Sequence, residues 1–516
     1  MHHLLLQSAR LAPENIALIH KKQTWTYQTL NDCVQQQAQA LLTLHIKPKQ
    51  RVAVFLPKQL ETVSSFFAIS LIGAVVVPIN PVLKPLQVAH IVNDCTVSVL
   101  ITSKSRYQQL AVVLEQCSDL HSIILVDDVP TIKTDKQLLN WQTFLNRAQP
   151  SVFPNLIDTD VAAILYTSGS TGKPKGVVLS HRNLVTGAKS VSEYLTINAS
   201  DKILAVLPFS FDYGLNQLLS SILNQASCVL LDYLLPKDVL NALETYQITG
   251  LAAVPPLWAQ LAKLDWSNTI HLRYLTNSGG KLPKAVLSVI RERVPNAKFF
   301  LMYGLTEAFR STYLPPEQLD KRPDSIGKAI PNAEILVVRE DGSLCAPYEA
   351  GELVHKGSLV ALGYWNDVKK TAERFKPAPQ QLSALPLTEM AVWSGDTVMQ
   401  DEEGYLYFVG RSDDMIKTSG YRVSPTEIEE VVYASGLVKE AAVIGVPDDN
   451  LGQVIVLVIA IHEYYNETEL IKHCQTQLPN FMQPAKIIVL EHLPKNPNGK
   501  IDRAALSLHF TQHISS

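Results

Sequence analysis

The chain has 516 residues, of which 47% are apolar, and its formal net charge is −3 from 45 basic and 48 acidic side chains. This length exceeds what one hydrophobic core usually serves, so we expect at least two domains. Nucleic acid is an unexpected partner, because binding a polyphosphate backbone requires an excess of Lys and Arg that this sequence lacks.

The spacing of the cysteines and the apolar runs indicate in which cellular compartment the protein is found. Six cysteines lie far apart without the paired spacing of a disulfide framework or a zinc site, so we expect reduced, mostly buried thiols. The start of the chain, Met1 to Gln7, has no Lys or Arg and only three leucines, unlike a signal peptide. The most apolar run, residues 62–79, predicts a buried helix and a strand rather than a transmembrane segment. We expect a cytoplasmic protein.

Short β-branched runs alternate with helical stretches, and this alternation predicts largely parallel sheets. The runs are residues 52–56, 97–102, 123–126, 161–166, 202–206, 227–231 and 299–303. A helix is expected to start at Ser180-His181. Near residue 411 the pattern changes to short acidic helices and hairpins, where residues 424–427 predict a capping box that opens a helix ending at Ser435.

A loop rich in glycine, small hydroxyl residues and lysine directly follows the apolar run at residues 161–165. Its glycines let the backbone approach an anion closely and its polar groups can bind phosphate oxygens, so ATP is the first candidate ligand. A Walker A loop would need a glycine at 167 and Ser or Thr at 174, where the chain has Thr167 and Pro174. A Gly/Ser linker is the alternative, but linkers rarely carry paired lysines between a strand and a helix. The candidate phosphate-binding residues are Thr167, Ser168, Gly169, Ser170, Thr171, Gly172, Lys173 and Lys175.

Seven motifs, in order along nearly the whole chain, resemble those of the adenylate-forming superfamily, which includes acyl-CoA synthetases and nonribosomal peptide adenylation domains. Residues 301–332 and 211–216 resemble in particular acyl-CoA ligases associated with exosortase systems. The motifs are Trp25-Thr26-Tyr27, Gly73-Ala74 through Pro81, the glycine loop, Tyr303 to Glu307, Trp393 to Asp396, Gly410 to Asp413 and Asn498 to Ile501.

This resemblance implies an α/β fold in two domains. Residues 1–412 would form a large domain of two similar α/β subdomains with a small β-barrel-like part. Residues 413–516 would form a small mobile α+β cap, with its hinge at Asp413.

The resemblance also implies an AMP-forming carboxylate:CoA ligase. In that reaction a carboxylate attacks the α-phosphorus of ATP, pyrophosphate leaves, and the acyl adenylate then reacts with a thiol. The expected small molecules are ATP, Mg²⁺, CoA and a carboxylic acid that is fatty or otherwise apolar. A separate acyl-carrier protein is an alternative source of the thiol, because the chain has no appended carrier motif.

Residues in the matching motifs acquire expected roles from the resemblance. Glu307 would bind Mg²⁺ beside Thr306, since magnesium favours carboxylate and phosphate oxygens; a solvated carboxylate is the alternative. Lys500 would enter from the small domain as the catalytic lysine, although a lone lysine here is otherwise a surface residue. Lys495 is expected to be surface charge only. Tyr303 would lie near the adenine. The other nucleotide- or CoA-contacting candidates are Gly279, Gly280, Gly304, Asp396, Phe408, Arg411, Lys417 and Gly420.

Two of these roles have a chemical reason. Asp396 can accept hydrogen bonds from both ribose hydroxyls with one carboxylate. One small domain cannot present Lys500 to the first step and its opposite face to the second without rotating, so a hinge is required. After rotation Lys417 and Gly420 would face the large domain, and Gly420 would leave room for a pantetheine arm.

The acyl group is expected among Phe211, Asp212, Tyr213, Val254 and Trp258. Asp212 is open to two interpretations: it could pair with a substrate ammonium, as in amino-acid-activating relatives, or cap a helix that begins at Tyr213. Three hypotheses therefore stand: a carboxylate:CoA ligase, an amino-acid-adenylating enzyme that loads a separate carrier, and a catalytically silent nucleotide-binding homologue.

Overall fold

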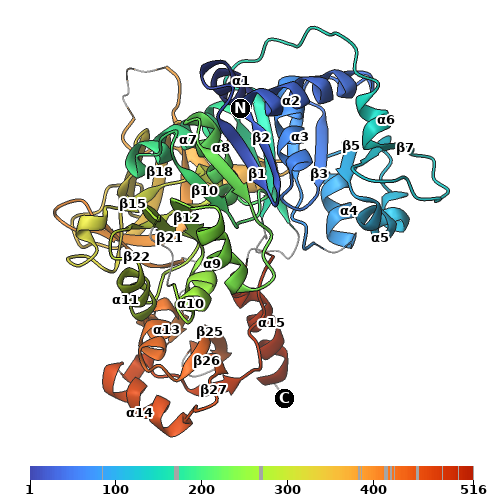
Figure 1. Cartoon of the computed structure of the whole chain (residues 1–516). Helices are drawn as coiled ribbons and strands as arrows, with labels where there is room; N and C mark the ends of the chain where they lie inside the picture. The colour runs from blue at the N-terminus through green and yellow to red at the C-terminus, as the bar shows by residue number, and fades with distance from the viewer. Residues whose placement is uncertain are drawn as a thin grey trace.

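The structure is a computed structural model of the whole chain. It describes residues 1–83, 85–167, 174–266, 271–381, 384, 386–411, 416–418, 421–423, 425–448, 452–478, 480–497 and 499–514. Three sheets organise the fold, two in a large N-terminal part and one in a small C-terminal part, which Figure 1 shows in orange to red.

The largest sheet has 14 described strands in the order β17-β18-β21-β22-β16-β15-β14-β13-β12-β10-β11-β1-β2, with β20 paired to β21. Strands β14, β13, β12, β10, β11 and β1 are parallel, as the alternating pattern predicts. From β15 onward the pairing is antiparallel, so the expected β-barrel-like part continues the same sheet. The strands are β1 (Ile16–His20), β2 (Gln23–Thr26), β10 (Lys202–Ala205), β11 (Ser227–Leu230), β12 (Gly250–Ala253), β13 (Tyr274–Asn277), β14 (Lys298–Tyr303), β15 (Thr312–Leu314), β16 (Ser325–Ala329), β17 (Ala333–Val338), β18 (Gly351–Gly357), β20 (Phe375–Pro377), β21 (Met390–Gln400) and β22 (Leu406–Arg411).

The second sheet has eight described strands in the order β19-β9-β8-β4-β3-β5-β6-β7 and is parallel from β8 to β7. Strand β9 was not predicted; it pairs antiparallel with β8, and these two strands come directly before and after the glycine loop in the sequence. The strands are β3 (Arg51–Phe55), β4 (Val75–Pro78), β5 (Val97–Thr102), β6 (Ser122–Leu125), β7 (Gln137–Asn140), β8 (Val161–Thr167), β9 (Lys175–Ser180) and β19 (Gly363–Tyr364).

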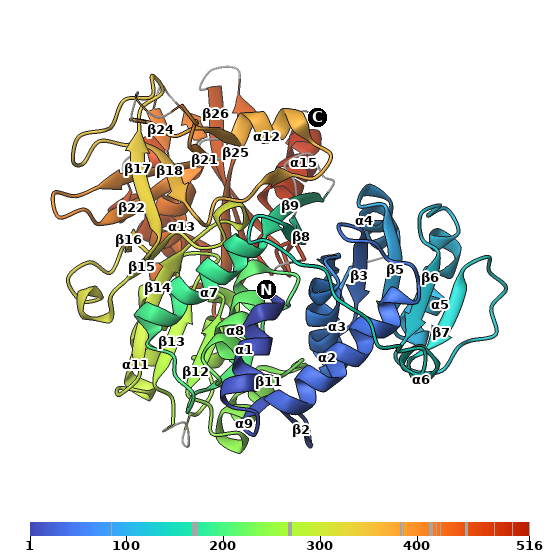
Figure 2. The ribbon, with the colours of Figure 1, turned by 90° about the horizontal axis from the view of Figure 1, so that it is seen from above.

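Helices α1, α2, α3 and α8 lie between these two sheets (Figure 2). Helix α3 is buried along its whole length and leads into β4, which confirms the prediction for residues 62–79. Helix α7 begins at His181, as predicted. The helices of the large part are α1 (His2–Leu11), α2 (Tyr27–Leu42), α3 (Leu60–Leu71), α4 (Pro85–Asp94), α5 (Lys104–Leu114), α6 (Trp141–Leu145), α7 (His181–Leu195), α8 (Asp212–Leu223), α9 (Pro236–Thr245), α10 (Pro255–Leu261), α11 (Lys284–Arg293) and α12 (Val368–Arg374), with 3₁₀ turns η1 (Thr306–Ala308) and η2 (Pro316–Gln318).

The small part is an α+β unit whose described strands follow the order β24-β23-β26-β25, with β27 on β26. Helix α13 begins at Pro425 and ends at Ala434, one residue before the predicted end; the capping side chains predicted for it lie outside the described ones. The elements are β23 (Ile416–Thr418), β24 (Tyr421–Val423), β25 (Val438–Asp448), β26 (Gly452–Ile461), β27 (Lys486–Val489), α13 (Pro425–Ala434), α14 (Glu467–Gln477), α15 (Arg503–Ile514) and η3 (Asn480–Met482).

The six cysteines are free thiols. Cys95, Cys117, Cys228 and Cys474 are buried, and the other two are half-buried. In the portion of the chain that the structure describes, no helix has the length and apolarity needed to cross a membrane.

Candidate active site

The carboxyl ends of neighbouring parallel strands meet at one edge of a sheet, and the loops that follow them come together there. The loop after β10 carries Phe211, the residue after β12 is Val254, and Ser278 and Gly279 follow β13. Tyr303 is the last residue of β14, and the YGLTE motif continues into η1. The predicted substrate-pocket residues, the Gly279-Gly280 pair and the YGLTE motif are therefore gathered by the strand order β10-β12-β13-β14, which no local sequence pattern reveals.

Glu307 belongs to a compact network at the base of the glycine loop. Its Oε1 accepts hydrogen bonds from Lys175 Nζ at 3.2 Å and from the Tyr364 hydroxyl at 2.5 Å. Lys175 Nζ also donates to the Tyr364 oxygen at 2.9 Å and lies 4.2 Å from the centroid of that ring. The network forms because β9 has β8 on one side, where Thr167 faces Lys175, and β19 on the other.

Burial and charge act in opposite directions on this pair. Burial would raise the pKa of Glu307, but the Lys175 charge and the Tyr364 hydrogen bond outweigh it and lower that pKa. Burial lowers the pKa of Lys175, and the charge of Glu307 partly opposes this. The carboxylate is therefore held ionised beside the loop, which contradicts the alternative of a solvated surface residue. Tyr364 had no motif to mark it, since its contact with Glu307 depends on the β9–β19 pairing.

Tyr303 and Asp396 form a second contact in the large part. The Tyr303 hydroxyl donates to Asp396 Oδ2, and its ring centroid lies 6.1 Å from that of Phe408. Asp396 is buried on β21 opposite Arg411 of β22. Its backbone N–H donates to Ser394 Oγ at 3.1 Å, which fixes the local turn of the strand. The three predicted nucleotide residues Tyr303, Asp396 and Phe408 are thus neighbours.

Asp212 is the first residue of α8, with Phe211 as the N-cap, and no side-chain hydrogen bond caps this described helix. The capping interpretation is therefore wrong, because the Asp212 side chain turns instead to η1, where Thr306 Oγ1 donates to its Oδ1 at 3.0 Å. Burial raises the pKa of Asp212, opposed by the charges of Arg310 and Lys500 and by the Thr306 hydrogen bond. A carboxyl group so deeply placed is unusual without a further role.

Lys500 reaches the same region from the small part. Its turn is closed by the Asn496 N–H donating to the Lys500 carbonyl at 2.8 Å, and Asn80 Nδ2 of the large part donates to the Pro497 carbonyl at 3.1 Å. Gly279, at φ +85°, lies next to it: a Cβ built there would be 3.5 Å from Lys500 Cε, an ordinary van der Waals contact. Lys500 is therefore placed beside the loop after β13.

Lys495 corrects a smaller expectation. It forms an ion pair with Glu440 of β25, so it ties the Lys500 turn to the sheet of the small part rather than serving as surface charge only.

The remaining predicted residues divide into three groups. Thr167 ends β8 with a buried hydroxyl that lacks a hydrogen-bond partner among the described residues. Trp258 of α10 is fully buried in the core, its ring centroid 6.5 Å from that of Trp266, and Gly280 packs against Pro255. The structure leaves undescribed Ser168, Gly169, Ser170, Thr171, Gly172, Lys173, Asp413 and Gly420, together with the side chains of Arg411 and Lys417.

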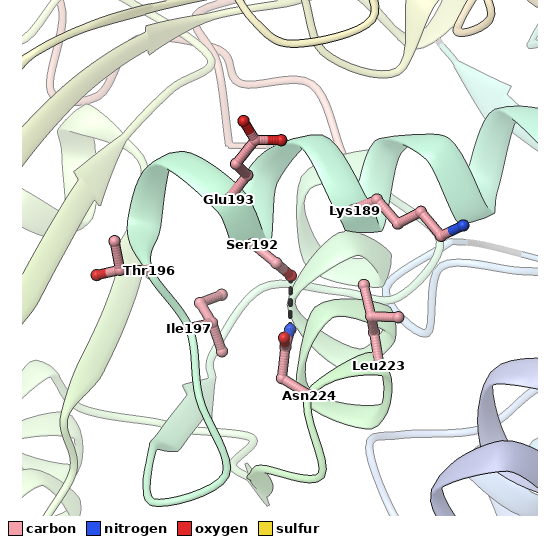
Figure 3. Close-up of a pocket in the computed structure, with 7 residues that line it drawn as sticks. All are labelled: Lys189, Ser192, Glu193, Thr196, Ile197, Leu223 and Asn224. Atoms are coloured by element: carbon pink, nitrogen blue, oxygen red, sulfur yellow. Dashed lines mark hydrogen bonds between the residues drawn. The ribbon is translucent and has the colours of Figure 1, made fainter.

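A separate surface hollow lies at the ends of α7 and α8 and contains none of the predicted residues (Figure 3). Asn224 Nδ2 donates to Ser192 Oγ across it at 2.7 Å. Its lining is Lys189, Ser192, Glu193, Thr196, Ile197, Leu223 and Asn224.

Comparison with known protein families shows to which family the chain belongs. Residues 5–365 match the family described as AMP-binding enzyme, and residues 427–500 match the AMP-binding enzyme C-terminal domain. The chain belongs to the AMP-binding enzyme family. The superfamily and fold predicted from the seven motifs are confirmed, whereas the exosortase-associated subgroup stays a prediction.

Several characterised proteins resemble this AMP-binding enzyme over nearly its whole length. It is 29% identical over 505 residues to the 2-succinylbenzoate–CoA ligase of Bacillus subtilis, covering 97% of this chain and 96% of that one. The Bacillus subtilis o-succinylbenzoate CoA synthetase, solved with its acyl-adenylate intermediate, superposes with a TM-score of 0.83 at 28% identity over 98% and 97% of the two chains. It has also been solved with ATP and magnesium ion.

Two further proteins resemble the chain, one in its structure and one in its sequence. An anthranilate CoA ligase solved with anthranoyl-AMP has a TM-score of 0.90 over 100% and 98% of the two chains, but at 24% identity it shows the fold alone. A linear gramicidin synthase of Brevibacillus parabrevis is 30% identical over 513 residues, 98% of this chain. This AMP-binding enzyme spans only 6% of that protein's length.

Proposed function

We propose that the chain is an AMP-forming carboxylate:CoA ligase. It would activate a carboxylic acid with ATP, release pyrophosphate, and transfer the acyl group from AMP to the thiol of CoA. The observation that carries the proposal is the position of Lys500, which enters from the small part and lies beside Gly279 in the region of Asp212 and Thr306. The CoA ligase that matches this chain from end to end also supports it.

The first step needs positive charge at the reacting oxygens. A carboxylate attacking an α-phosphate brings two anions together, so a fixed ammonium and hydroxyl lower the barrier by stabilising charge as the bond forms. In this proposal Lys500 supplies the ammonium and Thr306 the hydroxyl. Tyr303 lies against the adenine and Asp396 accepts the ribose hydroxyls.

Glu307 fits the metal role. Among the described residues no cluster of three or more His, Cys, Asp or Glu side chains could hold a metal. Magnesium in nucleotide enzymes needs only one or two carboxylates, with phosphate oxygens and water as the other ligands. Bound at Glu307, Mg²⁺ would neutralise phosphate charge, and the ionised state of that carboxylate suits this use. Lys175 and the undescribed glycine-loop residues would contact the same phosphates.

The second step is assigned to a rotated arrangement of the small part. Lys500 now occupies the space beside Gly279, so the CoA thiol would approach after the Lys500 turn has moved away. Asp413 is proposed as the pivot, with Lys417 and Gly420 on the face that then meets the large part. A bulky side chain at Gly420 should therefore slow thioester formation while sparing adenylate formation.

The identity of the acid is the least constrained part of the proposal. The sequence favours a fatty or other apolar acid, in keeping with Phe211 and Val254 beside Gly279. An amino acid loaded onto a separate carrier protein is the second candidate, favoured by the buried Asp212 carboxyl, which could bind an ammonium. A catalytically silent nucleotide-binding homologue is the third.

The test is acid-dependent ATP–pyrophosphate exchange with Mg²⁺ on the purified chain, across fatty, aryl, dicarboxylic and amino acids, followed by thioester detection with CoA. Exchange with a carboxylic acid and formation of its CoA thioester is the expected result. Exchange with amino acids and no CoA product would replace the ligase by carrier loading. ATP binding without exchange for any acid would leave the silent homologue.

A further inference from the structure

Arg310, three residues after Glu307, is a buried guanidinium whose donors are only partly used. It is 2% exposed. Its Nη1 donates to Ser278 Oγ at 2.7 Å, and its Cζ lies 4.6 Å from the centroid of the Tyr213 ring. Nε and Nη2 have no hydrogen-bond partner in the described part of the chain. Burying a charge with unmade hydrogen bonds costs several kcal/mol, so these donors indicate a group that the chain itself does not provide.

The two unused donors lie on one edge of the guanidinium. Nε–H and the nearer Nη2–H point the same way in the planar group, and this edge is the fork that binds a carboxylate through two parallel hydrogen bonds. Lysine cannot reproduce this geometry, because its ammonium is a point charge without a planar fork. The Nε–Nη2 edge of Arg310, whose donors are unpaired among the described residues, therefore matches a carboxylate in both shape and charge.

Arg310 shares its neighbours with the proposed reaction site. Ser278, which binds its Nη1, directly precedes Gly279, and Gly279 lies against Lys500. Tyr213, which lies under the guanidinium, directly follows Asp212, whose carboxyl is bonded to Thr306. Arg310 and Lys500 therefore adjoin one connected group of residues, which links the arginine to the proposed reaction site.

The chain is fitted closely around this arginine. Phe309 has φ +58° and ψ −45°, a positive-φ conformation that costs a bulky residue about 1–3 kcal/mol and recurs at functional sites. Gly187 has no side chain where the Phe309 ring packs, and a Cβ on Gly304 would lie 3.1 Å from Arg310 Cα. These contacts hold the backbone reversal that turns Arg310 inward.

We propose that Arg310 determines substrate specificity by binding a second carboxylate of the acid, so that the substrate is a dicarboxylic acid. One carboxylate would react beside Lys500 and Thr306, while the other receives the Nε–Nη2 edge of Arg310. The inference rests on the proposed ligase function and replaces the expectation of a wholly apolar acid. Burial raises the pKa of Asp212, and the charges of Arg310 and Lys500 oppose this rise.

The experiment compares matched acids in ATP–pyrophosphate exchange with Mg²⁺. The pairs are succinate with butyrate, glutarate with pentanoate, adipate with hexanoate and phthalate with benzoate, so that each diacid is compared with a monoacid of similar size. We expect kcat/KM for at least one diacid to exceed that of its partner by about 10-fold or more, because a site built to bind a charged group rejects analogues that lack it.

Variants of Arg310 test whether this residue causes the preference for diacids. Arg310→Met and Arg310→Lys should each reduce the diacid-to-monoacid ratio of kcat/KM by about 10-fold or more, with Lys retaining charge but not the fork. Ser278→Ala is the matched control, since it removes the Nη1 contact and leaves the Nε–Nη2 edge intact, and should change the ratio by less than about 3-fold. If both Arg310 variants fail to fold, the comparison of diacids with monoacids on the wild-type chain still tests the preference for a second carboxylate.

The possible results distinguish the dicarboxylate specificity of Arg310 from the proposed ligase function. Exchange with monoacids or simple amino acids at least equal to that with diacids overturns the inference and leaves adenylation standing. Equal loss for both members of a pair in the Arg310 variants also overturns it, since the arginine would then bind the reacting carboxylate or serve structure alone. If no acid supports exchange, the proposed function fails. Calorimetry then measures the affinity of the four diacids for the wild-type chain and for Arg310→Lys. If wild type binds none of the diacids more tightly than Arg310→Lys does, the inference is overturned.

Discussion

Glu307 and Asp212 are two acidic side chains on either side of Thr306, and each has a cation nearby. Glu307 is bonded to Lys175 and Tyr364, so its charge is matched within the chain. Asp212 is bonded to Thr306, while the unused edge of Arg310 has no partner in the described chain. The shifts in pKa follow this difference: that of Glu307 is lowered and that of Asp212 is raised. In the free protein the charge of Glu307 is matched by the chain itself, whereas two donors of the nearby Arg310 are not used by it.

The largest expected effect lies outside both groups, in Lys500→Ala. Losing the ammonium between the carboxylate and the α-phosphate should reduce adenylate formation about 10²–10³-fold, the size typical of removing one preorganised charge stabiliser. Thioester formation from a supplied adenylate should change far less. Single-turnover assays of each half-reaction measure this, with Lys495→Ala as the control on the same turn. Equal losses in both half-reactions would remove the proposed role of Lys500.

Glu307→Gln should have the next largest effect on activity. The amide cannot bind Mg²⁺ with a charged oxygen, so we expect a roughly 10²-fold lower exchange rate and a higher Mg²⁺ requirement. Tyr364→Phe is its matched control: it removes one hydrogen bond to the same oxygen and should cost about 10-fold or less. A magnesium titration of exchange rates separates the two, and an unchanged Mg²⁺ dependence in Glu307→Gln would argue against metal binding there.

We expect Glu307 and Asp212 to make the stability of the protein change with pH in opposite directions. The lowered pKa of Glu307 means that its stabilisation is present above about pH 4.5, its ordinary value, and is lost as pH falls below it. The raised pKa of Asp212 means that stability falls as pH rises from 3.8. At pH 7 we therefore expect a lower Tm for Glu307→Gln and a higher Tm for Asp212→Asn.

Thermal unfolding of wild type and both variants from about pH 4 to pH 8 measures this contrast. The difference between Asp212→Asn and wild type should shrink toward the acidic end, where the wild-type carboxyl is already neutral. An Asp212→Asn variant that loses stability at pH 7 as strongly as Glu307→Gln would show that both carboxyl groups are structural.

The smallest effect concerns the contact that orients the small part. Lys281 of the large part pairs with Glu430 of α13 as well as with Asp324, both partly exposed. Exposed pairs contribute about 0.2–1 kcal/mol, so Lys281→Ala should lower the ratio of adenylate to thioester rates by about 1.4- to 5-fold, less so at high salt. Lys284→Ala is the control, because its pair with Asp324 lies within the large part. No shift in the ratio would mean that this ion pair does not bias the orientation.

Local pattern determined much of this protein. Periodicity placed the strand runs within one or two residues, since burial on both faces of a parallel strand leaves an apolar run that needs no knowledge of its neighbours. Collinear motifs identified the superfamily, and they named Lys500, Thr306, Glu307, Asp396 and Tyr303 as the residues to examine. Strand β9 was missed because its short apolar run lies between the glycine loop and the start of α7, where hairpin and linker look alike in sequence.

Tertiary structure decided which of these residues meet and which charges are matched. Tyr364 contacts Glu307 through the β9–β19 pairing, across more than fifty residues of chain. Asp212 was open to capping, and only the packing of η1 against α8 turned it toward Thr306. Arg310 stood unmarked beside a recognised motif, because sequence shows that an arginine is present but not whether its donors are used. Hydrogen bonding is a property of the folded arrangement, and only there do the unpaired Nε and Nη2 donors of Arg310 become visible.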